Sequence, residues 1–172
     1  MFLLGNEEAK NDMAFERILC AVDLSTESEP VFQTAAEFAL QAKRELRLLH
    51  VIEAQPVTRE LPPVKSLGEV ALTMEQKAVI AMQTLINSAG KNLENVTVTS
   101  EIDSGEAAQE IINHARRWKA DLIVLGARGA PSLADIIAGS TAQRVTKEAP
   151  CSVLVVRSDR RKASFKDSRG AR

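Results

Sequence analysis

Five short apolar runs, each separated from the next by a helical pattern, constrain the fold of this chain more than any other feature. The runs occupy residues 17 to 23, 46 to 52, 96 to 102, 121 to 126 and 152 to 157. Runs of this length, bounded by turn residues, are typical of buried strands. Strands that alternate with helices favour a parallel sheet covered on both faces, because each crossover places a helix against it. The sequence therefore predicts an α/β fold.

Apolar residues at helical spacing mark the four helices that connect these strands. We expect Ser25 or Thr26 to cap the first helix, and the last helix to begin at Ser140. The apolar stripes of the first three helices are Val31, Ala35, Phe38, Ala39 and Ala42; then Leu67, Val70, Met74, Ala78, Ala81 and Leu85; then Ala108, Ile111, Ile112 and Ala115, within about 106 to 119.

The composition of the strands predicts their order. The third strand alternates Val96, Thr97, Val98 and Thr99, as expected at an exposed edge, whereas the first, fourth and fifth are apolar almost throughout. The simplest arrangement is a doubly wound, five-stranded sheet of order 3-2-1-4-5. The fifth strand, at residues 152 to 157, then forms the other edge without a protecting Lys or Pro. We expect a second copy to pair there or to pack over it, which predicts a homodimer.

Length and charge limit the domain organisation and the partners. A chain of 172 residues suits one domain, at 15 to 157, between a flexible segment at 1 to 14 and a basic disordered tail at 158 to 172. Its 22 Lys and Arg balance 23 Asp and Glu, so no overall field favours nucleic acid or an anionic membrane. No secretory signal or membrane-length apolar run is present in the sequence, which predicts a cytoplasmic protein.

The cysteines and histidines do not suggest a catalytic or metal site. Cys20 and Cys151 lie in apolar runs, where a small buried thiol is the expected interpretation. We expect His50, in a strand, and His114, among apolar helical neighbours, to be hydrogen-bonded packing residues. Four such residues without zinc-ligand spacing predict no metal site.

Three of the chain's eight glycines fall in one stretch, GARGAPSLADIIAGST, at 126 to 141. Gly126 and Gly129 could supply turns of positive φ, and Gly139 could start a helix. The alternative is that bare backbone, with the hydroxyls of Ser140 and Thr141, receives phosphates at a helix N-terminus. The spacing is neither that of a Walker A loop nor that of a dinucleotide fingerprint. The stretch leaves the fourth strand, where a doubly wound sheet reverses direction and binds ligands.

The spacing Gly-x2-Gly-x9-Gly-Ser-Thr resembles the nucleotide-binding motif of the universal stress protein family, in its ATP-binding class. ILCAVDLS, LLHVIE, DLIVLGARG and APCSVLVVR resemble that family's first, second, fourth and last strands, in order. The resemblance covers about residues 15 to 157. It implies a Rossmann-like fold of the adenine nucleotide alpha hydrolase-like kind, and a site for ATP, ADP or AMP, with or without Mg²⁺.

The resemblance also assigns a role to each residue that matches the motif. On the adenosine side, it implies that Asp23 lies near the ribose or a metal-bridged phosphate and that Val51 offers backbone groups to adenine. Asp23 could instead cap the turn that follows it. Arg128 either reaches the phosphates or faces solvent. The remaining implied contacts are Ala21 and Val22 along the adenosine, Leu125 and Gly126 under the ribose, and Gly129, Gly139, Ser140 and Thr141 on the phosphates.

Three functions stay open on these residues. The leading one is a regulatory, stress-response module that binds ATP without fast turnover, because no activated nucleophile or P-loop lysine is found. The second is a slow Mg²⁺-dependent ATP hydrolase that uses Thr141 or Arg128. The third is a structural dimer whose glycines only form turns. A Gly126→Val substitution is expected to remove nucleotide without unfolding if the binding interpretation is correct.

Overall fold

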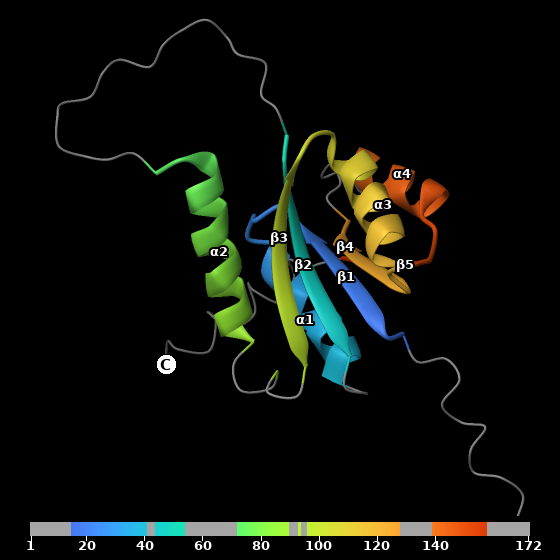
Figure 1. Cartoon of the computed structure of the whole chain (residues 1–172), viewed down its shortest axis with the longest axis horizontal. Coiled ribbons are helices and arrows are strands. Elements are labelled where there is room, and N and C mark those ends of the chain that lie inside the picture. Colours follow the sequence, from blue (N-terminus) through green and yellow to red (C-terminus); the bar gives the residue numbers. More distant parts are fainter. Residues whose placement is uncertain are drawn as a thin grey trace, which may run out of the picture.

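The computed structural model describes residues 15–40, 44–53, 72–89, 93, 96–127 and 139–157, and it confirms the predicted sheet (Figure 1). All neighbouring strands pair in parallel, in the order β3-β2-β1-β4-β5. The strands are β1 (Arg17–Val22), β2 (Glu45–Ile52), β3 (Thr97–Ser104), β4 (Leu122–Gly126) and β5 (Ser152–Val156). Each bound lies within two residues of its prediction. The predicted end segments and most of the loop after β2 lie outside the described residues.

Two helices cover each face of the sheet, because alternate strand residues point to opposite sides. One face carries α1 (Ser28–Leu40) and α2 (Met74–Ser88), and the other carries α3 (Ala107–Trp118) and α4 (Ser140–Glu148). On β1, Ile18 and Cys20 pack toward α1 while Leu19 packs toward α3. In the described part of the chain, no helix is long and apolar enough to cross a membrane.

The first helix begins later than its predicted N-cap indicated, and the second begins later than its apolar pattern predicted. Ser25 and Thr26 precede α1, which starts at Ser28, so neither immediately flanks the helix. In α2, the expected Ala78 and Leu85 are buried, but Met74 is 66% exposed. Met74 is the first residue of α2, after the N-cap Thr73, and the whole stretch from 72 to 77 is exposed. The stripe residues Leu67 and Val70 lie outside the described residues.

The two edges of the sheet have different surfaces. Most residues of β3 are exposed or partly exposed polar residues, which confirms its predicted edge position. At the opposite edge, the apolar residues of β5 from Val153 to Val156 are only partly buried. Each described residue of β5 pairs with β4, so its other side has no partner strand within the sheet.

Candidate functional site

The carboxyl ends of β1 and β4 lie side by side at the reversal of the sheet. Ala21 pairs with Leu125 across these strands, and Gly126 follows as the last residue of β4. Asp23 comes directly after β1. This edge is the position at which doubly wound sheets bind ligands. Strand pairing therefore brings the predicted adenosine-side residues of β1 and β4 to one edge.

Most of the side chains predicted for the adenosine side belong to the core. Ala21, Val22 and Leu125 are 7%, 8% and 3% exposed. Val51, on β2, is partly buried against the same cluster as Ala21 and Leu125. A buried strand residue can present only its backbone, or the edge of its side chain, to a ligand above the sheet. These residues could therefore contribute to ligand binding only through the shape of the surface and their backbone polar groups.

The carboxylate of Asp23 caps the turn between β1 and α1. Its Oδ1 accepts a hydrogen bond from the amide of Ser25 at 2.9 Å and another from the hydroxyl of Ser28 at 3.1 Å. Leu24, which lies between Asp23 and Ser25, has the unusual φ of 59°. The turn-capping alternative for Asp23 is therefore present in the structure. Asp23 is also exposed, so the same carboxylate lies at the surface of the edge.

The glycine at the end of β4 has a packing reason that its sequence position does not reveal. A Cβ placed on Gly126 would lie 3.3 Å from Cγ2 of Val31 on α1. Gly126 does not have a positive φ, so the predicted turn explanation is wrong for this residue. Valine at position 126 would press on α1. The Gly126→Val substitution consequently cannot separate loss of nucleotide from disturbed packing.

Helix α4 begins at Ser140, as predicted, and its N-cap residue has no side chain that could bond the first backbone amides. Gly139 is the N-cap, with φ −53° and ψ 160°, and it makes no side-chain capping bond. Ser140 is exposed and Thr141 partly exposed in the first turn. A helix that follows one parallel strand and precedes the next runs antiparallel to both, so this end lies at the carboxyl edge of the sheet. The other predicted phosphate residues, Arg128 and Gly129, lie outside the described residues.

The N-terminus of α3 is occupied by carboxylates instead. Glu106 is its N-cap, and its two oxygens accept from the amides of Ala108 and Gln109, each at 3.1 Å. Glu53, after β2, accepts from the amide of Ala107 at 3.3 Å. Sequence reasoning missed Glu106 because Ser, Thr, Asp and Asn are the residues that usually signal an N-cap. Gly105, immediately before it, has φ 151°, a conformation that favours glycine.

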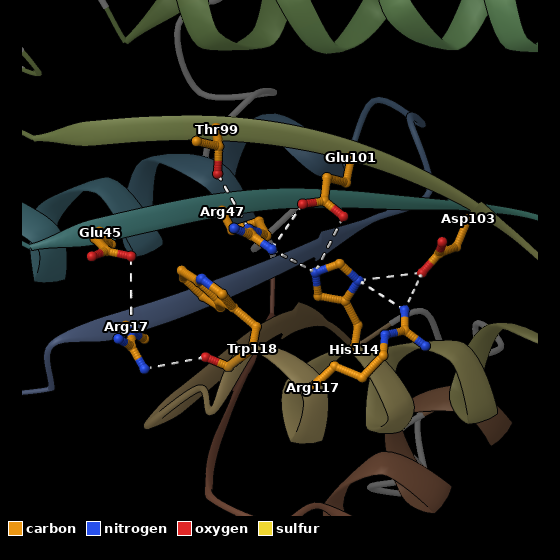
Figure 2. Close-up of polar contacts among 9 residues, drawn as sticks. All are labelled: Arg17, Glu45, Arg47, Thr99, Glu101, Asp103, His114, Arg117 and Trp118. Atoms are coloured by element: carbon orange, nitrogen blue, oxygen red, sulfur yellow. Dashed lines mark hydrogen bonds and ion pairs between the residues drawn. The ribbon is translucent and has the colours of Figure 1, made fainter.

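His114, on α3, is buried within a polar cluster under the β3 edge (Figure 2). Its Nδ1 lies 3.2 Å from Oδ2 of Asp103, and its Nε2 lies 3.3 Å from Nη1 of Arg47. The shorter contacts favour the tautomer in which Nε2 accepts from Arg47 and Nδ1 donates to Asp103, since an arginine only donates and a carboxylate only accepts. His114 is therefore a hydrogen-bonded packing residue, as predicted.

Arg47, on β2, joins the same cluster to the only tryptophan of the chain. Its guanidinium carbon lies 4.4 Å from the centre of the Trp118 ring, and its Nη1 lies 2.8 Å from Oε1 of Glu101 (Figure 2). Its Nε donates to the hydroxyl of Thr99 at 3.3 Å. The cluster thus joins α3 to β2 and β3 by paired charges and one cation–π contact.

The other histidine and the two thiols are also accounted for by packing. The Nδ1 of His50 donates to the carbonyl of Val22 at 2.9 Å, which ties the ends of β2 and β1 together. Burial raises the pKa of the Cys20 thiol far above its usual range. Burial, and secondarily the Asp121 carboxylate, raises the pKa of Cys151, which is partly exposed rather than buried. Among the described residues, no group of His, Cys, Asp or Glu could hold a metal ion.

Comparison with known proteins relates this chain to a family. The model of the universal stress protein family matches residues 14–157. Universal stress protein YxiE of Bacillus subtilis is 30% identical over 149 residues, which span 83% of this chain and 99% of YxiE.

Two solved structures share the fold. A universal stress protein in complex with cAMP has a TM-score of 0.63 at 17% identity, covering 85% of this chain and 99% of its own. A universal stress protein from Archaeoglobus fulgidus, in complex with dAMP, has a TM-score of 0.53 at 22% identity, covering 83% and 98%. Given the family match and the YxiE relationship, the chain belongs to the universal stress protein family.

Proposed function

We propose that this chain binds ATP at the carboxyl edge of its sheet and acts as a regulatory nucleotide-binding module in the stress response. The observation that carries the proposal is the N-terminus of α4, which follows the N-cap Gly139 without a side-chain capping bond, at the carboxyl edge of the sheet. Phosphates bind helix N-termini through exposed backbone amides and the helix dipole. The start of α4 fits such a group, whereas the carboxylate-filled start of α3 does not.

The adenosine would lie over the ends of β1, β2 and β4. Val51, near the end of β2, would present its backbone to adenine, and Leu125 and Gly126, at the end of β4, would lie beneath the ribose. Asp23 is exposed there, and hydroxyl groups of a ribose are suitable partners for a carboxylate. Structural neighbours in complex with cAMP and dAMP support an adenine nucleotide as the class of ligand.

The phosphates would lie against α4. One charge at an exposed helix N-terminus contributes about 0.3 to 1 kcal/mol, so several donors must act together. Ser140 and Thr141 add hydroxyls to the amides of the first turn, and Arg128 and Gly129 would complete the site. In this proposal, Mg²⁺ is held mainly by the phosphates themselves, as is usual for this ion.

Direct analysis of bound nucleotide tests the proposal. Purified protein is denatured, and the released small molecules are separated and quantified, with binding of ATP, ADP, AMP and cAMP then measured by calorimetry on nucleotide-free protein. We expect an adenine nucleotide to be recovered and ATP to bind with a stoichiometry near one. Failure to bind any adenine nucleotide would overturn the proposal. Bound ATP that stays intact for hours with Mg²⁺ indicates a binding module, while steady phosphate release indicates the hydrolase.

The β5 edge supports a second, structural part of the proposal. Its partly exposed Val153 to Val156 form an apolar edge strand, and a second copy would cover this strand in a homodimer. Analytical ultracentrifugation at micromolar concentration tests this, and we expect twice the chain mass. A Val155→Lys substitution is expected to give monomers that still bind ATP. A wild-type monomer would contradict the dimer without affecting nucleotide binding.

A further inference from the structure

One side chain of α4 connects this helix to the start of α3, whose N-terminus is capped by carboxylates. Arg144, on α4, forms an ion pair with Oε2 of Glu106, the N-cap of α3. Its Nη2 also donates to Oε1 of Gln109 at 2.6 Å, in the first turn of α3. Its Nε lies 3.5 Å from Oε2 of Glu148, one turn further along α4. The guanidinium therefore uses donors in three directions, two of them toward the start of α3.

Within the described part of the chain, helix α4 buries few side chains that could fix its position. It has nine residues, and only Ala142 and Val145 are buried. Isolated helices of this length are marginal in water, and two small buried side chains leave rotation about the helix axis weakly restrained. Arg144 follows Ser140 by four residues, so it lies one turn above the start of the helix, on the same side. A bond made by Arg144 thus restrains the orientation of the first turn.

Arg144 also neutralises a charge that would oppose phosphates. Glu106 lies at the same edge of the sheet as the start of α4, and its carboxylate would repel an approaching phosphate. The ion pair with Arg144 compensates that charge while both Glu106 oxygens continue to cap α3. The pair is separated by 38 residues in the sequence and joins two helices that pack side by side (Figure 1).

We infer that Arg144 is a positioning residue, whose ion pair with Glu106 fixes the first turn of α4 in the orientation that receives the nucleotide phosphates. This inference rests on the proposed function. In it, Arg144 does not contact the nucleotide. It holds the amides and hydroxyls of Ser140 and Thr141 in place before the ligand arrives, so that less ordering is required on binding.

Two substitutions on the two helices distinguish positioning from simple charge attraction. Arg144→Met removes the pair together with a positive charge, whereas Glu106→Gln removes the pair together with a negative charge and leaves Arg144 in place. Positioning predicts that both variants bind ATP about three- to tenfold more weakly, since a preorganised donor set is lost in each. Charge attraction alone predicts opposite effects, with Glu106→Gln binding ATP more tightly.

Adenosine and Arg116 supply the controls. Adenosine lacks phosphates, so its affinity should stay unchanged in both variants, whereas general unfolding would weaken both ligands. Arg116, on α3, donates from Nη2 to the carbonyl of Glu148 at 3.4 Å, at the far end of α4. Arg116→Met therefore removes the same charge from the same pair of helices without releasing the first turn. We expect it to bind ATP as the wild-type chain does.

Hydrogen exchange in the nucleotide-free protein gives a readout that does not depend on ligand. Amides of residues 140 to 145 should exchange faster in Arg144→Met and Glu106→Gln than in the wild-type chain or in Arg116→Met. Unchanged exchange, or tighter ATP binding by Glu106→Gln, would overturn the positioning role. If the wild-type chain bound no ATP, the proposed function would fail, whereas wild-type binding that survives both substitutions would overturn the role of Arg144 alone.

Discussion

The helices α3 and α4 lie side by side on one face of the sheet, but they begin in different ways (Figure 1). At the start of α3, the carboxylates of Glu53 and Glu106 accept from three successive backbone amides. At the start of α4, Gly139 offers no side chain. A helix start without a capping side chain is less stable than a capped one unless another group bonds its backbone amides. Among the described residues, side chains thus complete the start of α3, whereas no capping side chain bonds the start of α4, which is the difference that the proposed phosphate site requires.

Closing the start of α4 with a carboxylate is the most direct way to break this comparison. Gly139→Asp copies the α3 arrangement, and the φ of −53° at this position suits any residue. We expect ATP affinity, measured by calorimetry, to fall about a hundredfold, which corresponds to about 2.8 kcal/mol, because the carboxylate takes the amides and repels phosphates. The unfolding temperature should stay the same or rise, since Asp is a favoured N-cap.

Gly139→Asn is the matched control for this substitution. Asn has the same shape and also caps helices, but it carries no charge. Its affinity for ATP should therefore fall less than that of Gly139→Asp. A Gly139→Asp variant that binds ATP as tightly as the wild-type chain would show that the phosphates lie elsewhere.

The polar cluster of His114 separates the stability of α3 from the capping of its N-terminus, because it fixes α3 to β2 and β3 through other residues. His114→Leu fills the same buried space but leaves the facing atoms of Asp103 and Arg47 without this partner. We expect the free energy of unfolding to fall by about 2 kcal/mol, as is typical when one partner of a buried hydrogen bond is removed. Urea unfolding, followed by the fluorescence of Trp118, measures the change within the same cluster.

His114→Gln tests whether hydrogen bonding is the cause. A glutamine amide can donate to Asp103 and accept from Arg47, so this variant should lose less stability than His114→Leu. Neither substitution should change ATP affinity, because the cluster lies under the β3 edge, at the opposite side of α3 from α4 (Figure 2). Equal stability of His114→Leu and the wild-type chain would mean that the cluster contributes nothing to folding.

The sequence was sufficient for the fold because the fold depends on local patterns. Apolar runs located the strands, and the alternation of Val96 to Thr99 correctly placed β3 at an edge. Met74 was misplaced because helical spacing does not reveal that α2 begins at this residue, in an exposed first turn. The capping role of Thr73 decides that point, and it depends on a capping box with Gln76.

The site was less accessible to sequence reasoning because its details depend on distant residues. Gly126 is small because Val31 approaches it from α1, and no spacing within the glycine stretch contains that information. The pair of Glu106 and Arg144 likewise arises only when α3 packs against α4. The start of α4 at Ser140 was correctly predicted. The nucleotide contacts of the candidate residues stay predictions.

Removing the capping carboxylate of α3 tests the comparison between the two helix starts on the α3 side. Glu106→Ala removes the carboxylate that caps Ala108 and Gln109, and it also frees Arg144. We expect the free energy of unfolding, from urea denaturation, to fall by about 1 kcal/mol, the usual cost of losing an N-cap. Glu106→Asp, which retains a capping carboxylate on a shorter side chain, should recover part of this loss. A fully stable Glu106→Ala variant would contradict a capping role for this residue.

Helix α2 provides the smallest test, because it is capped like α3 but lies away from the proposed site. Thr73 and Gln76 bond each other's backbone amides at 2.9 and 3.1 Å. Residues 72 to 77 are all exposed, so this end can fray without disturbing the core. Thr73→Ala should therefore lower the free energy of unfolding by only about 0.5 kcal/mol, the low end for a lost cap, with ATP binding unchanged.

Thr73→Ser, which keeps the hydroxyl, should unfold at the wild-type urea concentration. If Thr73→Ala weakened ATP binding as Gly139→Asp is expected to, capping in general would affect the ligand, and the special position of α4 would be lost.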